Sequence, residues 1–453
     1  MMIPEAFRSR INATFSAEEA AEFLSSLQNP VSVSIRKNPM KKYTGFESQT
    51  VIGWTDDGFF LPERPEFILD PAFHAGAYYV QESSSMFIET ALKRIKLPSG
   101  SVLLDLCASP GGKSTLLLSH ISDDSLLVAN EVIQGRLPAL KENIRRWGFP
   151  NVIISNADPA DFESLPETFD LVLVDAPCSG EGLFRKDPEA HKQWSLENLQ
   201  TCELRQKRIL SSAIKALKPG GYLVYSTCTY NPGENEAQVD FLRRQGFEYI
   251  PVLETDEFPQ ITRLMHQGEE TGYAFYPHKV KGEGFFMAVL RKLDAEQYES
   301  TEMKHRKPFF DKGYAPSEAE KRWLKNPSDF VWKQRKDIFY LIPQKLEKEM
   351  EFILSALYSV YAGIAAGSMK GNEFLPDHAL ALSCVLHEDV PRIELSREDA
   401  LRFLKKESLR NTDYAKGFYA VTYQHLPIGW VKAVPGRLNN LLPAEYRIRK
   451  NID

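Results

Sequence analysis

The sequence predicts an α/β protein built on a mostly parallel sheet, with one further region before it and one after it. Between residues 81 and 295, apolar runs of strand length alternate with amphipathic segments of helix length. Acidic residues follow several of the apolar runs. Such alternation places helices on both faces of a parallel sheet. With 453 residues, 43% of them hydrophobic, the chain can bury more than one core.

The predicted elements follow one another in a regular order. Strands are expected at residues 101–106, 125–131, 151–158, 169–177 and 222–228. Helices are expected to begin near residue 113 and to cover 137–148 and 197–217, the last one ended by KPGG. In open parallel sheets, ligands bind beyond the carboxyl ends of the strands. The residues at those ends are therefore the first candidates for a functional site.

We expect three domains, at residues 1–80, 81–295 and 305–453. The polar segment KLDAEQYESTEMKHRKP is expected to link the last two. Residues 301–453 hold 25 Lys and Arg against 20 Asp and Glu, a net charge of +5, whereas residues 1–300 hold 30 against 41, a net charge of −11. A basic C-terminal region suits a polyanionic partner, but an ordinary solvated surface explains it equally well.

Composition excludes several classes of protein. No run approaches the 18 or more apolar residues that span a bilayer, and the first residues lack the apolar stretch of a signal peptide. We therefore expect a cytoplasmic protein without membrane contact. The five cysteines are an odd number without paired spacing, which argues against a disulfide framework and against a CxxC zinc site. We expect free thiols and no metal.

The first strand runs into a glycine-rich turn, LLDLCASPGGKST, which can present backbone N–H groups to an anion. A phosphate-binding P-loop would need glycine where Cys107 stands, and no GxGxxG is present. A nucleotide hydrolase is thus a remote alternative. Asp105 ends this strand and Glu131 ends the next, where an acid can take both hydroxyls of a ribose. This layout indicates an S-adenosylmethionine site.

Asp158 and Asp175 close the third and fourth strands in the same way. Any one of these acids could instead be a helix cap or a surface charge. Four acids at four consecutive strand ends are harder to explain as caps.

Three long, ordered motifs, DLCASPGGKS, DAPCSGEGLFRKDPEA and YSTCTYNPGENE, resemble those of the Sun/Nop-type RNA cytosine-5 methyltransferases. The resemblance extends from AGAYYVQESSSM (75–86) to EGFFMAVLRK (283–292). Residues 416–448 are similar to the tail of the bacterial members that modify small-subunit ribosomal RNA and carry a PUA-like domain. The resemblance implies a Rossmann-like class I methyltransferase sheet, a small N-terminal RNA-binding region and a C-terminal PUA-like α+β domain.

The resemblance also implies the cofactor, S-adenosylmethionine, and its ligands. The residues expected to hold it are Asp105, Cys107, Ala108, Ser109, Pro110, Gly111, Gly112, Lys113, Glu131, Arg136, Asp158 and Asp175.

Two cysteines at strand ends fit the chemistry of cytosine. Carbon 5 accepts a methyl group only after a thiolate has added to carbon 6, and a second group must then help to remove the carbon-5 proton. The resemblance assigns the nucleophile to Cys228 and the release step to Cys178, with Asp175 stabilising the adduct at ring nitrogen 3. The reverse order stays open, because DNA cytosine methyltransferases use a Pro-Cys cysteine as nucleophile and Cys178 follows Pro177. For Cys107, Cys202 and Cys384 we expect buried structural roles.

The expected substrate is RNA, with ribosomal RNA or the small ribosomal subunit favoured over transfer RNA, and the protein is expected to be a monomer. A non-catalytic RNA-binding protein is the remote alternative. A base must be single-stranded or flipped out to reach a strand-end thiolate. Phosphate contacts are expected first in SIRKNPMK (34–41) and VKAVPGRLNN (431–440), and at Arg185 and Lys186 unless these form exposed salt bridges.

Overall fold

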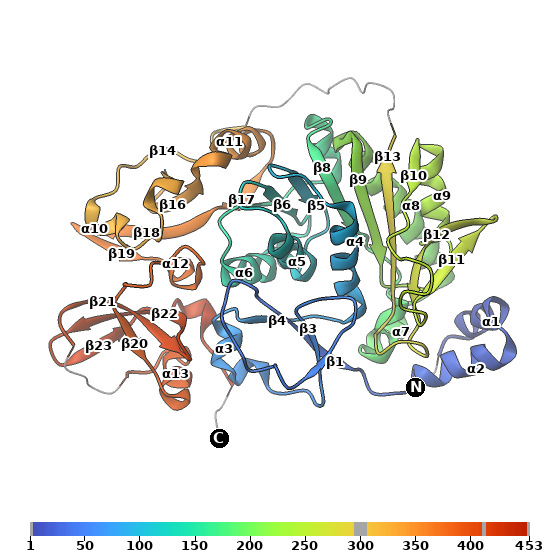
Figure 1. The fold of residues 1–453 in the computed structure, drawn as a ribbon, viewed down its shortest axis with the longest axis horizontal. Helices are drawn as coiled ribbons and strands as arrows, with labels where there is room; N and C mark the ends of the chain where they lie inside the picture. The colour runs from blue at the N-terminus through green and yellow to red at the C-terminus, as the bar shows by residue number, and fades with distance from the viewer. Residues whose placement is uncertain (1–2, 294–305, 410–413, 451–453) are drawn as a thin grey trace.

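The computed structural model describes residues 3–293, 306–409 and 414–450. Most of the expected linker between the second and third regions lies outside these residues. A large central sheet occupies the middle of the molecule (Figure 1). The N-terminal residues form a small sheet beside it and a pair of helices, and the C-terminal residues form two further small sheets.

The central sheet has ten strands in the order β11-β12-β13-β9-β8-β5-β6-β7-β17, with β10 paired to β13. The five strands from β7 to β9 are parallel, and the strands on either side of them are antiparallel. The strands are β5 (Val102–Asp105), β6 (Leu126–Asn130), β7 (Val152–Ser155), β8 (Phe169–Asp175), β9 (Leu217–Thr227), β10 (Phe247–Tyr249), β11 (Thr262–His266), β12 (Glu269–Phe275), β13 (Phe285–Lys292) and β17 (Ser359–Ala362). The predicted α/β fold and its five parallel strands are confirmed.

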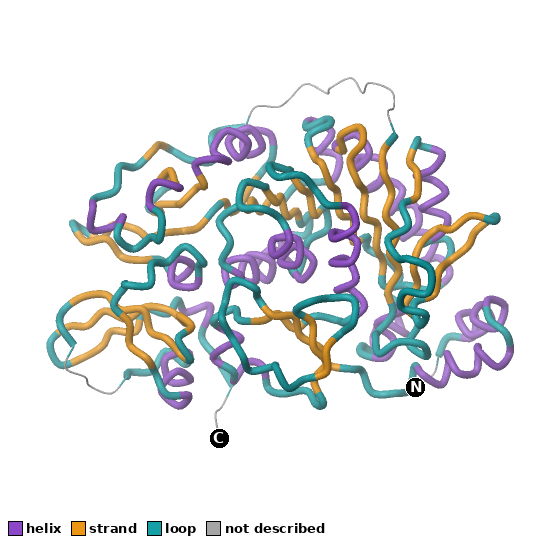
Figure 2. Tube along the Cα trace, viewed as in Figure 1, coloured by secondary structure: helices purple, strands orange, loops and turns teal. Residues whose placement is uncertain are grey.

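Helices lie on both sides of this sheet, as Figures 1 and 2 show. They are α4 (Ile88–Ile95), α5 (Gly112–His120) and α6 (Leu137–Trp147) on one side, and α8 (Leu196–Ala216) and α9 (Glu236–Arg244) on the other, with the short α7 (Pro188–Gln193) before α8. On α6 the buried residues Leu140, Ile144 and Trp147 recur every three to four positions, so one face of the helix covers the sheet. The sequence predicts that the helix expected at 197–217 ends at KPGG. In the structure α8 ends one residue earlier than expected, because the buried Leu217 pairs with Phe169 and begins β9, which contains KPGG.

The N-terminal region consists of a helix pair and a four-stranded sheet of order β2-β3-β1-β4. Its elements are α1 (Glu5–Thr14), α2 (Ala17–Ser26), β1 (Val33–Lys37), β2 (Thr50–Val51), β3 (Gly58–Leu61), α3 (Pro71–His74) and β4 (Tyr78–Val80). Phe7 and Phe23 of the helix pair share a buried cluster with Phe184, Trp194 and Tyr230. The helices therefore pack on the segment that follows β8.

The C-terminal region contains two sheets, of order β14-β15-β16-β18-β19 and β20-β21-β22-β23. Its elements are β14 (Lys312–Gly313), α10 (Glu318–Lys321), β15 (Phe330–Arg335), β16 (Ile338–Pro343), α11 (Glu347–Ala356), β18 (Ile364–Lys370), β19 (Glu373–Pro376), α12 (His378–Leu382), β20 (Arg392–Glu394), α13 (Arg397–Leu404), β21 (Gly417–Tyr423), β22 (Leu426–Val434) and β23 (Arg437–Asn440). The mixture of helices and strands agrees with the expected α+β character.

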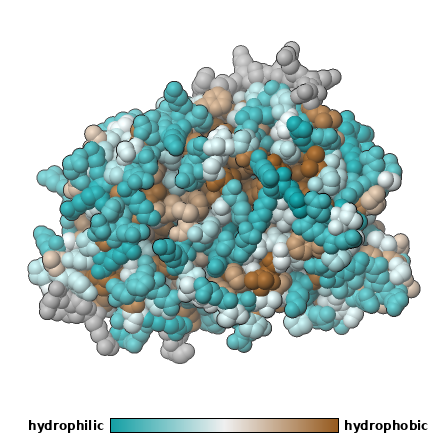
Figure 3. Space-filling model, in the orientation of Figure 1, coloured by the Kyte–Doolittle hydropathy of each residue, from teal (hydrophilic) through white to brown (hydrophobic). Residues whose placement is uncertain are grey.

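The C-terminal region is joined to the central sheet rather than attached by a linker alone. Its strand β17 pairs antiparallel with β7, with Ser359 opposite Ser155 and Tyr361 opposite Ile154. Without β17, the outer side of β7 would present unpaired backbone groups. The last sheet also shares a buried cluster with the N-terminal sheet, in which Val421 and Phe403 lie with Ile35 and Phe59. Figure 3 shows that one face of the assembled molecule is mainly hydrophilic, with small apolar patches.

Candidate active site

The glycine-rich turn between β5 and α5 forms one wall of a pocket of about 180 Å³. Gly111 adopts a φ of 111°, in the left-handed region, and a Cβ there would lie 3.3 Å from Leu140 Cδ1. Only glycine meets both conditions at low cost. The lining residues from the turn are Cys107, Ala108, Ser109, Pro110, Gly112 and Lys113, facing Asp175 and residues Tyr79 to Glu82 of the N-terminal region. The turn therefore shapes a site at the carboxyl edge of the sheet.

Asp105, the last residue of β5, is fully buried behind this turn. One carboxylate oxygen accepts a hydrogen bond from Ser114 Oγ at 2.6 Å, and Oδ1 has no partner among the described residues. Burial raises the pKa of Asp105 to about 7. A buried polar atom without a partner calls for an explanation, and a ligand with a hydrogen-bond donor would provide one.

Glu131 directly follows β6, on the neighbouring strand, and is 3% exposed. It accepts a hydrogen bond from the Ile133 backbone at 2.8 Å and pairs with Arg136, whose Nη1 lies 3.3 Å from Oε2. Arg136 also donates to the backbone oxygen of Ser109 at 2.7 Å. The guanidinium thus joins Glu131 to the glycine turn, and the part of both in cofactor binding stays a prediction.

Asp158 differs from the other acids. It lies three residues beyond β7, is 40% exposed and caps the short 3-10 helix Pro159–Ser164 by accepting from Ala160 N at 3.0 Å. It also pairs with Arg208 of α8. The structure gives it the helix-cap role that the sequence left open. Its part in cofactor binding stays a prediction.

Asp175 ends β8 and joins the glycine turn to β9. Its Oδ2 lies 2.7 Å from Lys113 Nζ, and its Oδ1 accepts from Ser226 Oγ at 2.9 Å. Burial opposes the charge on Lys113, but the neighbouring Asp175 raises the pKa of Lys113 above its ordinary value. Lys113 therefore stays charged beside the carboxylate and the pocket.

Cys178 and Cys228 are brought together, with their sulfur atoms 3.2 Å apart. Cys228 follows β9 directly and Cys178 lies three residues past β8, so two adjacent parallel strands deliver both thiols to one edge. The Cys228 backbone N–H points at Cys178 Sγ at 3.4 Å. The contact with Cys228, together with burial, raises the pKa of the Cys178 thiol. Both thiols are free.

The other three cysteines take no part in this sulfur–sulfur contact. Cys202 is buried on α8, and Cys107 lines the pocket, where burial raises the pKa of its thiol. Burial raises the pKa of Cys384 to about 11. Such thiols are poor nucleophiles near neutral pH.

Several residues at the site were missed from sequence. Glu181 and Glu234 are fully buried between the two cysteine loops, and Arg36 of β1 reaches the first turn of α5. Both acids stand inside the motifs that carry the cysteines, SGEG and PGENE, so the signal was present. Nothing in the pattern around Arg36 separates it from a surface cation.

The expected phosphate contacts are partly wrong. Arg36 is 1% exposed, and the amine of the partly buried Lys41 donates to the backbone oxygens of Ala75 and Arg146. Arg185 donates to the carbonyls of Gly282 and Pro30 at 2.7 and 2.6 Å. Each of these cations donates to backbone or side-chain acceptors of the folded chain, which favours a structural role over a phosphate contact. Lys186 pairs with Glu283 at 3.3 Å, and Lys432 pairs with Glu373.

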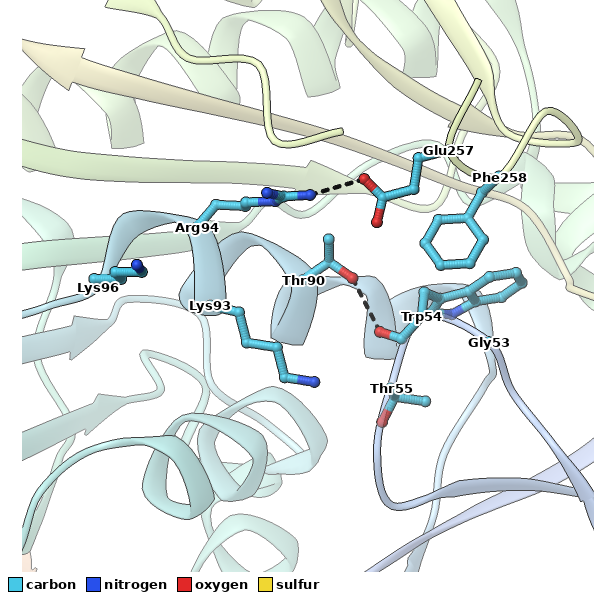
Figure 4. A pocket seen from close by; sticks show the side chains of 9 residues that line it. All are labelled: Gly53, Trp54, Thr55, Thr90, Lys93, Arg94, Lys96, Glu257 and Phe258. Carbon is cyan, nitrogen blue, oxygen red and sulfur yellow. Dashed lines mark hydrogen bonds and ion pairs between the residues drawn. The ribbon is translucent and has the colours of Figure 1, made fainter. Parts of the chain in front are cut away.

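A second pocket, of about 410 Å³, lies between α4 and the loop that holds Phe258 (Figure 4). Lys93, Arg94 and Lys96 line it, and two of these cations have carboxylate partners, since Arg94 lies 2.9 Å from Glu257 and Lys93 lies 2.6 Å from Asp56. None of the predicted site residues lines it.

Over the described ranges, we find no cluster of three or more His, Cys, Asp or Glu side chains that could hold a metal ion. No described helix is long and apolar enough to cross a membrane.

Comparison with known proteins matches three segments of the chain to family models. Residues 93–291 match the family model of the 16S rRNA methyltransferase RsmB/F, residues 3–83 match the N-terminal domain of RsmF, and residues 390–448 match the RsmF PUA domain. The ribosomal RNA small subunit methyltransferase F of Vibrio campbellii is 32% identical over 99% of this chain and 98% of its own. The chain belongs to this methyltransferase F family. The protein of the same description from Citrobacter koseri is also 32% identical, over 98% of this chain and 96% of its own.

Solved structures agree with the fold. A methyltransferase homologue from Pyrococcus horikoshii is 28% identical, with a TM-score of 0.55 over 64% of this chain and 95% of its own. NSun6 from Pyrococcus horikoshii, solved with SFG, has a TM-score of 0.55 at 23% identity over 64% of this chain and 99% of its own, and shows the fold alone. The resemblance, the class I methyltransferase fold with its N-terminal region and PUA domain, and the cofactor class, S-adenosylmethionine, are confirmed.

Proposed function

We propose that this protein transfers a methyl group from S-adenosylmethionine to carbon 5 of a cytosine in small-subunit ribosomal RNA. The observation that carries the proposal is the 3.2 Å contact between the sulfurs of Cys178 and Cys228, beside Asp175 and the glycine turn. The curated relatives are described as ribosomal RNA small subunit methyltransferases, which supports the choice of RNA.

The cofactor would supply the methyl group as an electrophile. The geometry that favours this site is the glycine turn around a pocket, the unpartnered Asp105 oxygen behind it and the buried Glu131 beside it. Glu131 would take the ribose hydroxyls, and Arg136 would keep Glu131 and the turn in register. Asp158, which is more exposed than Glu131, stays a proposed ligand of the cofactor.

Cys228 would act first, as the nucleophile. Its thiolate forms a bond from sulfur to carbon 6 of the cytosine, and the ring electrons move so that carbon 5 becomes an enamine carbon. Asp175 would hold the protonated ring nitrogen 3. Lys113, paired to that carboxylate, would keep its orientation fixed.

Cys178 would act in the release step. After methylation, carbon 5 still carries its proton, which the deprotonated sulfur of Cys178 would accept. The electrons of that C–H bond then form the ring double bond, and the bond from carbon 6 to Cys228 sulfur breaks. The 3.2 Å separation of the sulfurs supports this assignment, because both groups would then reach the adjacent carbons 5 and 6 of one ring.

RNA would be held by the domains that flank the methyltransferase domain. We propose three domains, at residues 1–80, 81–295 and 305–453, of which the first and the last supply RNA affinity. The exposed Arg437 in the last sheet is a phosphate contact in this proposal. We also propose that the protein acts in the cytoplasm, as a monomer and without membrane contact.

Bisulfite sequencing tests this function. Total RNA from a strain that lacks the gene should lose one or more 5-methylcytosine signals in 16S ribosomal RNA, and a plasmid copy should restore them. Purified protein should methylate the same position in naked 16S RNA or in small subunits prepared from that strain. Loss of signal in transfer RNA alone would overturn the ribosomal substrate, and no change in either RNA would overturn the proposed chemistry.

A further inference from the structure

A buried carboxylate joins the two loops that carry the cysteines. Glu234 lies six residues after Cys228 and is fully buried. It accepts hydrogen bonds from both the backbone N–H and the hydroxyl of Ser179, at 2.8 and 2.6 Å. Because Ser179 directly follows Cys178, a side chain from one cysteine loop holds the backbone of the other.

Three more donors reach the same carboxylate. They are Gln206 Nε2 at 3.2 Å, Asn231 Nδ2 at 3.2 Å and Thr229 Oγ1 at 3.4 Å. Burial raises the pKa of Glu234, and within the described parts of the chain it forms no ion pair. Ser179 gives two of these bonds and Gln206 and Asn231 give one each, whereas the single proton of Thr229 can go either to Glu234 or to the nearer Ser179 oxygen. Converging donors of this kind need a group that only accepts, which an ionised carboxylate is and an amide is not. The site is therefore specific for glutamate over glutamine.

Other bonds run across the same gap. Glu181, three residues past Cys178, accepts from the Tyr230 backbone at 3.0 Å, and Gly182 N–H donates to the Cys228 carbonyl at 2.9 Å. The hydroxyls of Ser179 and Thr229 lie 2.8 Å apart. Both loops lie beyond the ends of β8 and β9, where the strand ladder no longer fixes their separation.

We propose that Glu234 is a positioning residue that holds the two loops so that the sulfurs of Cys178 and Cys228 stay in contact. It touches neither sulfur and acts through Ser179 and Thr229. Its value for catalysis rests on the proposed function, but the sulfur contact itself can be measured without RNA or cofactor.

The test is oxidation of the full-length protein with diamide, followed by non-reducing peptide mapping. A disulfide needs the sulfurs to approach from 3.2 Å to about 2.05 Å, so the wild type should form the Cys178–Cys228 bond rapidly. In Glu234→Gln, the amide NH2 group faces donors instead of acceptors. The rate of formation of the Cys178–Cys228 disulfide should therefore fall roughly fivefold or more. Glu236→Gln, the same change two residues along the chain and without a hydrogen bond to either loop among the described residues, should react like the wild type.

Ser179→Ala keeps the backbone bond to Glu234 and loses only the hydroxyl, so it should slow the reaction by about twofold. It replaces Glu234→Gln in the test if that variant does not fold, as judged by circular dichroism and thermal unfolding. Equal rates in Ser179→Ala, Glu234→Gln and wild type, or an equal loss in Glu236→Gln, would overturn the positioning role. If the rates change as expected but the wild type methylates no RNA, the proposed function fails and the positioning role stands.

Discussion

The guanidinium of Arg36, in the N-terminal sheet, donates a hydrogen bond to the backbone oxygen of Gly112, the first residue of α5, at 3.2 Å. It also donates to Thr115 Oγ1 at 2.7 Å and to Gln81 Oε1 at 2.9 Å, and it stacks 4.7 Å from the Trp147 ring. Burial lowers the pKa of Arg36 to about 10. The N-terminal region thus holds the turn that lines the pocket proposed for the cofactor.

Replacement of Arg36 should weaken cofactor binding. Arg36→Met removes the bonds to Gly112 and Thr115, and we expect S-adenosylmethionine affinity to fall roughly tenfold in calorimetry, because the turn is no longer ordered before binding. Lys37→Met, on the next residue of the same strand, is the control. Equal affinity in both variants would show that β1 does not organise the turn.

Glu131→Ala should weaken cofactor binding more strongly, roughly 10- to 100-fold, because a buried acceptor pair for the ribose is lost. The measurement is calorimetry with S-adenosylmethionine at constant pH. Glu142→Ala changes a half-exposed acid on nearby α6 and should leave the affinity unchanged. A Glu131→Ala protein that binds as tightly as the wild type would remove Glu131 from the site.

The alanine variants of the two cysteines should differ in whether they form and retain a covalent adduct with RNA. Cys228→Ala should abolish methylation and any covalent link to RNA, because no bond to carbon 6 can form. Cys178→Ala should still attack and methylate but release slowly, so it should run as a slow protein–RNA band on a denaturing gel. A trapped band with Cys228→Ala instead would exchange the two roles.

Asp105 should make the cofactor-free protein less stable as pH rises. Its pKa is raised from 3.8 to about 7 in the folded state, so between these values the folded protein binds more protons than the unfolded chain. The stability that this carboxyl contributes is therefore present below pH 4 and lost by pH 7, a change of up to about 4 kcal/mol. Urea unfolding of the wild type and of Asp105→Asn at pH 4.5 and 7.5 measures this contribution to the free energy of unfolding, since asparagine does not titrate. A difference between the two proteins that does not change with pH contradicts the prediction.

Truncation after residue 300 should destabilise the methyltransferase domain as well as remove RNA affinity. It deletes β17 and leaves the outer side of β7 unpaired. We expect a lower thermal midpoint and aggregation for this fragment. Arg437→Glu in the full chain is the cleaner test of RNA affinity, and it should weaken binding and reduce its dependence on salt. A truncated protein as stable as the full chain would contradict the structural role of β17.

The sequence by itself determined the central fold and the pair of cysteines. Strand and helix periods differ, and each parallel strand is a short apolar run, so Val102–Asp105 and Phe169–Asp175 were predicted almost to the residue. The carboxyl ends of parallel strands meet at one edge, so Cys178 and Cys228 could be expected near each other once their strands were known.

Tertiary structure alone decided which charges are buried and which strands close the sheet. Arg36 and Lys41 read as surface cations because periodicity reports the backbone element, not the neighbour that covers it. The pairing of β17 with β7 joins residues about 200 positions apart, and no local pattern encodes such a partner. The roles of Glu181 and Glu234 also depend on donors from another loop, so only the folded chain shows that each is satisfied.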